Sequence, residues 1–347
     1  MNWKKLSLIS VLSLVAMIVV IPSLVVIPYI SSSETTENYQ TNDKDAEVDV
    51  SGSDGRVEED PYVVSVFRSQ QRKVDDVPLE KYVAGVVASE MPADFEPEAL
   101  KAQALAARTY VVKHVLNGEK VPEGGQITDT VQHQVYKSEE ELKKQWGEDF
   151  DWKMQKIKEA VEATQGEILT YEGNPIEPAF FSTSNGYTEN AEDYWTNPIP
   201  YLKSVPSPWD EASPKFESQA IFTLEEAASK LGVSITSKGN AITNLTRTES
   251  DRVKTVTIGG KEFTGREVRE ALDLRSSDFT VELKGDHLVF QTEGYGHGVG
   301  MSQYGANGMA KEGKTYKEIV TYYYKGAEVT NIGSDPERVT ALKREEV

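Results

Sequence analysis

Four glycines alternate with other residues in the run Gly294-Tyr-Gly-His-Gly-Val-Gly300, far down a chain of 347 residues. Alternating glycines allow backbone conformations that other residues avoid, and they let the backbone approach its neighbours closely. Because their register differs from the G-x-G-x-x-G fingerprint, we do not expect a nucleotide site. We expect a tight loop that displays polar side chains around a ligand, with a purely structural turn as the alternative. The displayed side chains are His297, Ser302, Gln303 and Tyr304.

A carboxylate ends an otherwise apolar helical stripe. Pro92 stops this helix, which places Glu90 in its last turn, near the negative end of the helix dipole. Burial and the dipole both disfavour the ionised form, so we expect a raised pKa and a general-acid role for Glu90. A structural acid paired with Arg or Lys is the alternative. The three-and-four spacing of the stripe comes from Leu79, Val83, Val86, Val87 and Glu90.

Two lysines near the start of the sequence, Lys4 and Lys5, precede an apolar run (6–30) that is long enough to cross a bilayer. No small-residue cleavage site follows, so we expect an uncleaved signal anchor that leaves the bulk of the chain outside the membrane. The predicted segments are a cytoplasmic N-terminus (1–5), a transmembrane anchor (6–30), an acidic flexible linker (31–60), a catalytic domain (61–330) and a tail (331–347).

Composition excludes several classes of protein. Cysteine is absent, which rules out a disulfide framework, a thiolate nucleophile and a thiolate metal site. The net charge of −19 argues against nucleic acid as a partner, since phosphate binding needs clustered Lys and Arg. A stable domain must therefore rest on its hydrophobic core.

Start and stop signals predict a second helix over 96–116, after a strand at 61–67. Gln103 and Tyr110 share one stripe of this helix, and Arg108 projects beside it, so their polar groups could reach a cleft next to Glu90. Pairing on a surface is the alternative for such groups.

An amphipathic helical segment (138–166) and a hairpin (167–171 and 176–181) follow, and they lead into a polar loop. Its hydroxyls and amide could bind sugar hydroxyls or N-acetyl groups, although a turn with local capping fits the same residues. The loop consists of Ser182, Thr183, Ser184, Asn185 and Gly186.

Between about residues 205 and 290 the pattern changes, with predicted helices at 223–231 and 265–272 and an alternating segment at 253–258. These features predict an inserted α/β subdomain with a structural or groove-forming role. The fold class predicted for the chain is α+β, with one large catalytic domain that contains this insertion and follows one transmembrane helix.

The histidines are scattered, and none forms an H-x-x-x-H ligand pair. No G-x-S-x-G elbow favours Ser182 or Ser302 as a nucleophile, although the sequence does not exclude a catalytic triad. We expect His297 to hydrogen-bond to substrate or to the surroundings of Glu90, and we expect no metal and no other cofactor.

Four motifs carry a family resemblance. They are Ser89-Glu-Met-Pro92, Lys101-Ala-Gln-Ala-Leu-Ala-Ala-Arg-Thr-Tyr110, Ser182-Thr-Ser-Asn-Gly186 and Gly296-His-Gly-Val-Gly-Met-Ser-Gln-Tyr-Gly-Ala306. The region that holds them, about 63–329, resembles the stage II sporulation protein D family. The resemblance implies a peptidoglycan lytic transglycosylase that acts in septal wall remodelling and engulfment during endospore formation, with Glu90 as its catalytic acid.

The implied reaction cleaves the β-1,4 bond between N-acetylmuramic acid and N-acetylglucosamine. The 6-hydroxyl of the muramic acid closes a 1,6-anhydro ring, so one carboxyl can protonate the leaving oxygen and then accept the hydroxyl proton. The implied partners are glycan strands stripped of peptides by a companion amidase, and a multispanning membrane protein. The implied location is the cell membrane, with a single span and the domain in the space between mother cell and forespore.

Two alternatives also come from the resemblance. Related domains are described as enhancers of cell-wall amidases, so a non-catalytic wall-binding enhancer competes with the enzyme. Some relatives hold a metal through His and Cys near the segment that matches residues 130–136, which here contains His133. Because this chain has no cysteine, a metal-dependent hydrolase is the more distant alternative.

Overall fold

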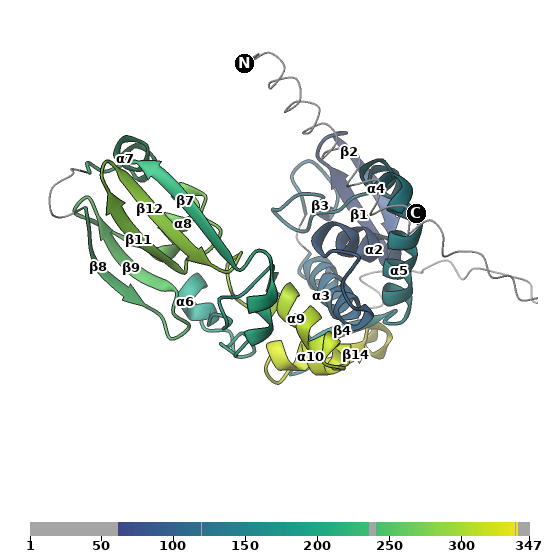
Figure 1. The fold of residues 1–347 in the computed structure, drawn as a ribbon. Coiled ribbons are helices and arrows are strands. Elements are labelled where there is room, and N and C mark those ends of the chain that lie inside the picture. Colours follow the sequence, from purple (N-terminus) through teal and green to yellow (C-terminus); the bar gives the residue numbers. More distant parts are fainter. Residues whose placement is uncertain (1–61, 119, 236–240, 337, 339–347) are drawn as a thin grey trace, which may run out of the picture. The chain divides into compact units, whose positions relative to one another are not determined.

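The computed structural model describes residues 62–118, 120–235, 241–336 and 338 (Figure 1). These residues belong to one compact unit, 58–347, of mixed α and β structure. The predicted segments 1–5, 6–30 and 31–60, and most of the tail 331–347, lie outside the described residues. Within the described part of the chain, no helix combines the length and apolar character that a bilayer span requires.

The described residues form two hydrophobic cores, and the first is organised around α3 (Pro97–Leu116), which is buried along most of its length. Its alanines let other helices pack closely against it, and α2, α5, α9 and α10 all contact it (Figure 1). The helices of this core are α2 (Leu79–Glu90), α4 (Glu139–Trp146), α5 (Phe150–Glu162), α6 (Ala191–Trp195), α9 (Gln303–Lys311) and α10 (Tyr316–Tyr323).

Three small sheets border this core. In the first, β1 (Val63–Arg68) pairs antiparallel with β2 (Lys73–Pro78) and parallel with β3 (Ile127–Thr128). In the second, β4 (Glu167–Tyr171) lies between β5 (Asn174–Pro175) and β14 (Glu328–Asn331). In the third, β6 (Phe180–Phe181) runs parallel to β13 (Met301–Ser302), which joins the polar loop to the glycine run.

The second core lies among residues 220–290 and has two sheets. One has the strand order β11-β12-β7 and the other β10-β9-β8, with α7 and α8 packed on them (Figure 1). A capping box begins each helix, at Thr223 and at Thr264. The elements are β7 (Glu217–Thr223), α7 (Leu224–Leu231), β8 (Ile242–Arg247), β9 (Val253–Ile258), β10 (Lys261–Thr264), α8 (Gly265–Leu272), β11 (Phe279–Lys284) and β12 (His287–Glu293).

The segment 138–166, predicted as one helix, is divided in the structure. Gly147 has a φ of 56°, which ends α4, and the 3₁₀ turn Gly147–Asp149 leads into α5. The predicted hairpin is also shorter, because β5 has two residues and the chain then leaves β4 to pair β6 with β13. Two further 3₁₀ turns span Pro208–Ala212 and Ile332–Ser334.

Candidate active site around Glu90

Glu90 is the last residue of α2, as the helical stripe predicts. The N–H of Met91 donates to Val87 O, and the extended conformation of Met91 ends the helix just before Pro92. Most of the helix above Glu90 is buried, whereas Glu90 itself is partly exposed. Its carboxyl group therefore stands at the point where a buried helix meets solvent.

A groove of about 330 Å³ opens at this carboxyl. It brings together Glu90, Tyr110 and His297, three residues that the sequence places on three distant segments. The walls are aromatic and apolar, with a few polar groups, as in many sites for organic ligands. The remaining lining residues are Val131, His133, Gln134, Val135, Glu177, Pro178, Ala179, Phe180 and Trp195.

The surroundings of Glu90 favour its protonated form. Burial raises the pKa of Glu90 above its ordinary value, and a backbone hydrogen bond from Val135 opposes that rise without cancelling it. No Lys or Arg among the described residues forms an ion pair with Glu90. The interpretation of Glu90 as a paired structural acid therefore has no support in the described part of the chain.

Gln303 and Gln103 stand behind Glu90. The Gln303 side-chain amide donates to Glu90 O at 3.0 Å, and its nitrogen also lies 3.4 Å from Gln103 Oε1. Gln303 thus satisfies one of the carbonyls left open at the end of a helix. Both glutamines are buried and neither lines the groove, so the structure makes them supports for the end of α2.

Gln134 is a polar group of the groove wall that sequence analysis missed. Its Oε1 accepts from Tyr82 Oη at 3.2 Å, and its side-chain nitrogen has no hydrogen-bond partner within the described residues. A buried donor without a partner costs free energy, so a ligand that supplies an acceptor here would remove this cost. An N-acetyl carbonyl is one such acceptor.

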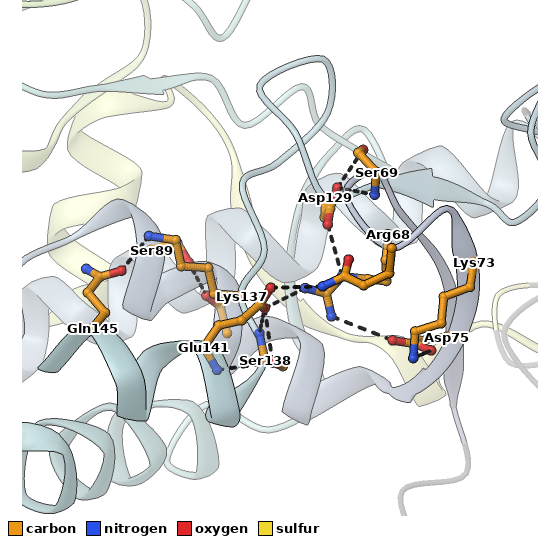
Figure 2. A network of polar contacts seen from close by, with 12 residues as sticks. Arg68, Ser69, Lys73, Asp75, Ser89, Asp129, Lys137, Ser138, Glu141 and Gln145 are labelled. Atoms are coloured by element: carbon orange, nitrogen blue, oxygen red, sulfur yellow. Dashed lines mark hydrogen bonds and ion pairs between the residues drawn. The ribbon is translucent and has the colours of Figure 1, made fainter. Parts of the chain in front are cut away.

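An ion-pair network fixes the wall that contains Gln134. Figure 2 shows Arg68 between acids, with its Nε 3.0 Å from Asp129 Oδ2 and its Nη2 2.5 Å from Glu141 Oε2. The Asp129 carbonyl accepts from the N–H of Tyr136, whose ring lies under the Arg68 guanidinium. Residues 129–136 are thereby closed into a loop beside Glu90.

A larger cavity of about 580 Å³ lies beside this network. Four of its charged lining residues pair with one another: Asp75 with both Arg68 and Lys73, and Glu141 with Arg68 (Figure 2). We place the candidate active site in the smaller groove, because the unpaired carboxyl with a raised pKa lies there.

His297 lines the groove as an aromatic wall. Its Nδ1 accepts from the N–H of Val299 at 3.1 Å, and the ring makes a second backbone hydrogen bond with Phe180. Burial, with a contribution from Arg269, lowers the pKa of His297 to about 4, so the ring is neutral near pH 7. The ring therefore already has two backbone partners, and a hydrogen bond from His297 to substrate stays a prediction.

The glycine run packs closely against a residue that lines the groove. All four of its glycines have positive φ, and a Cβ at Gly300 would lie 2.0 Å from Ala179 O. Ala179 is itself a lining residue of the groove. Close approach is therefore the reason for glycine at position 300, as the alternating pattern predicts.

Asp210 accepts hydrogen bonds from two hydroxyls that sequence analysis assigned to substrate, those of Ser184 and Ser302. Ser184 and Ser207 donate to its Oδ2 at 2.7 and 2.6 Å, and Ser302 donates to its Oδ1 at 2.6 Å. Burial raises the pKa of Asp210, and the serine hydroxyls oppose that shift. Because Ser302 also caps α9 through Gly305, this buried carboxyl orders the segments behind the groove.

The other residues of the polar loop also have structural partners. Thr183 is buried and bonds to Ser213, and Asn185 donates to Asp278 and to the carbonyl of Ser250 in the second core. Ser182 O accepts from the N–H of Tyr304, and Gly186 O accepts from Ser207. None of these loop residues lines the groove, so the prediction that they bind substrate there lacks support from their positions.

Arg108 also differs from the prediction. Its guanidinium is fully buried, binds Glu80 with Nη2–Oε2 at 2.5 Å, and donates to the carbonyls of Val161 and Glu167. The guanidinium therefore joins α2, α3 and the end of α5, and it does not line the groove. The sequence placed Arg108 on the correct helix, but its side chain lies on a face that does not border the groove.

The groove also holds a second carboxylate, Glu177, that sequence analysis did not single out. Lys113 Nζ lies 3.0 Å from Glu177 Oε2, so Glu177 has an ion-pair partner, whereas Glu90 has none among the residues described. Trp195, at the end of α6, packs on the His297 ring with a centroid separation of 5.7 Å. Glu177 lies in an irregular segment with prolines on both sides, and Trp195 ends a helix of five residues. Neither segment has a periodic pattern, so the sequence offers little indication of either residue.

A metal site does not fit the groove. His133 Nδ1 lies 2.7 Å from Thr128 Oγ1, and no group of three or more possible His, Cys, Asp or Glu ligands occurs among the described residues.

The region around Glu90 has relatives among known proteins. A family described as stage II sporulation protein matches residues 68–171, which include all of α2 and α3. Stage II sporulation protein D of Bacillus subtilis (strain 168) is 54% identical over 273 residues, 78% of this chain and 79% of that protein. Stage II sporulation protein D of Bacillus amyloliquefaciens is 50% identical over 294 residues, 84% and 86% of the two chains. The amidase enhancer of Bacillus subtilis (strain 168) is 29% identical over 302 residues, 71% of this chain and 40% of that protein.

Proposed function

This chain belongs to the stage II sporulation protein D family, and from that premise we propose that it is a peptidoglycan lytic transglycosylase. The proposed substrate is the peptide-free glycan strand, cleaved between N-acetylmuramic acid and N-acetylglucosamine. The proposed setting is wall remodelling and engulfment during sporulation, at the membrane, with a companion amidase and a multispanning membrane protein as partners.

One observation carries the proposal: the carboxyl of Glu90 has a raised pKa, has no ion-pair partner among the described residues, and lies in a groove with aromatic walls. A protonated carboxyl can donate to the glycosidic oxygen as the bond to the muramic acid breaks. The 6-hydroxyl of the same sugar then forms the new bond to its anomeric carbon, and the Glu90 carboxylate accepts the hydroxyl proton. The group ends in the protonated form in which it began.

The support around Glu90 suits this cycle. Gln303 holds the carbonyl end of α2, so the carboxyl starts from a fixed backbone position. The side-chain amide of Gln134 offers a donor to an N-acetyl carbonyl, and the rings of Tyr110 and Trp195 border the groove where sugar rings would lie.

The test is mass spectrometry of peptide-free glycan strands incubated with the purified chain. We expect products with 1,6-anhydromuramic ends from the wild type and none from Glu90→Gln. Glu177→Gln is the matched control, because it removes the other carboxylate of the groove, and it should keep the same products. Hydrolytic products with reducing muramic ends, lost in Glu177→Gln, would contradict the proposal and indicate a two-carboxylate hydrolase.

The second candidate is a non-catalytic enhancer of a cell-wall amidase, which the likeness to the amidase enhancer favours. Under this function wild type and Glu90→Gln bind glycan equally and neither cleaves it. An amidase assay with and without the chain then separates the two candidates, because only an enhancer raises amide cleavage in the Glu90→Gln background.

A further inference from the structure

Two cations alternate with two aromatic rings near the start of the glycine run. The Lys215 ammonium lies 5.5 Å from the centre of the Tyr295 ring and 5.7 Å from that of Tyr304. The Arg275 guanidinium lies 5.4 Å from the centre of the same Tyr295 ring. We call Arg275, Tyr295, Lys215 and Tyr304 the basic–aromatic strip.

The charges of this strip lack acidic partners. Neither Lys215 nor Arg275 forms an ion pair within the described residues, although the chain carries a net charge of −19. Arg247 of the second core, by contrast, pairs with Asp278 at 2.7 Å. Two unpaired cations against the exposed Tyr295 ring and the half-buried Tyr304 ring, on an acidic protein, form a local surface that is complementary to an anionic ligand.

The strip is accessible and firmly placed. Tyr295 is 39% exposed, a high value for an aromatic side chain. Its backbone exchanges two hydrogen bonds with Thr183, at 3.0 and 2.7 Å, which ties it to the segment after Phe181. The Arg275 carbonyl accepts from the N–H of Gly296, the residue before His297. These backbone bonds connect the strip to the same β6 segment and glycine run that form the groove wall.

We propose that the basic–aromatic strip binds the carboxylates of a glycan that extends out of the Glu90 groove. Arg and Lys bind carboxylates through charge-assisted hydrogen bonds, and ring faces such as that of Tyr295 provide flat surfaces for sugar rings. The identity of the glycan rests on the proposed function. In a peptide-free strand each muramic acid carries a free lactyl carboxylate, whereas an attached peptide converts this group into a neutral amide. The strip is therefore a specificity site that favours peptide-free strands.

The test measures binding in the Glu90→Gln background, where the strand stays intact. One set of peptide-free strands keeps its lactyl carboxylates, and the other has them converted into methyl amides. We expect tighter binding to the carboxylate form by roughly tenfold, as two partly exposed charge pairs would give. Lys215→Gln with Arg275→Gln should abolish this preference, and added salt should reduce it.

The control is the double variant Lys261→Gln with Lys284→Gln, which also removes two positive charges, but from other positions in the second core. Lys261 lies over Phe263 and Lys284 pairs with Glu282, so neither belongs to the strip. An equal preference in the strip variant and this control would overturn the inference, and so would equal binding of the two strands by the parent protein. Failure of the proposed function gives a different result, the absence of 1,6-anhydro products when the wild type is incubated with peptide-free strands.

Discussion

Replacing Arg108 by Met tests the structural role of this residue directly. The substitution keeps most of the apolar stem but removes a buried guanidinium that binds Glu80 and two carbonyls. Removing one partner of a buried ion pair costs about 3–5 kcal/mol. Because Glu80 keeps a hydrogen bond from the N–H of Gly166 at 3.1 Å, we expect the lower end, about 3 kcal/mol. That is a large part of the ~5–15 kcal/mol that stabilises a typical domain.

The assay is urea unfolding followed by far-UV circular dichroism, with the free energy of unfolding obtained by linear extrapolation. The control is Arg266→Met, which breaks an exposed pair with Glu270 on α8 and should cost less than about 0.5 kcal/mol. Glu80→Leu combined with Arg108→Met should recover stability, since replacing both members of a buried pair by apolar groups leaves no orphaned charge.

The reasoning fails if Arg108→Met unfolds at the same urea concentration as its control. It also fails if the variant keeps wild-type stability but loses glycan turnover, because that result would return Arg108 to the substrate-binding role predicted from sequence.

Three further outcomes follow from groups near the groove. Burial raises the pKa of Glu90 in the folded state, so the wild type loses stability as pH rises through that pKa. In urea titrations between pH 4 and 8, the free energy of unfolding of Glu90→Gln should therefore rise relative to that of the wild type. A difference between the two proteins that stays constant with pH would contradict this. Burial alone would raise the pKa of Glu141, but the Ser138 backbone N–H and the Arg68 guanidinium lower it to about 2. The stability that Glu141 contributes is present above its ordinary pKa near 4.5 and lost as pH falls towards 2, so Glu141→Gln should flatten the acid limb of thermal unfolding. Gly300→Ala should destabilise the chain by at least about 2 kcal/mol more than Gly118→Ala, because both have positive φ but only position 300 meets a backbone oxygen; equal melting temperatures would refute the clash.

The elements that the sequence predicted well depend on local signals. The ends of α2 and α3 follow from apolar spacing and from prolines within a few residues, so Glu90 could be placed in its helix correctly. Gly147 shows the limit of this approach, because a helical pattern continues through it while its backbone turns.

The polar partners were harder to predict, because they depend on contacts between distant segments. Ser184 and Ser302 have the composition of a sugar-binding loop, yet a single carboxyl from the turn at Asp210 occupies both hydroxyls. Likewise, the Phe180 backbone group that bonds to the His297 ring becomes its neighbour only when β6 pairs with β13. Residue type indicated polarity correctly, but only the fold determines which polar groups remain available to a ligand.

The chain enters and leaves the second core at neighbouring points. Glu217, the first residue of β7, pairs with Glu293, the last residue of β12, and the N–H of Gly294 donates to Phe216 O at 2.6 Å. Residues 217–293 can therefore change in length without rerouting the chain through the first core. Arg275 lies inside this segment, while Lys215 and Tyr295 flank its two junctions. Glycan preference can thus evolve separately from the chemistry at Glu90.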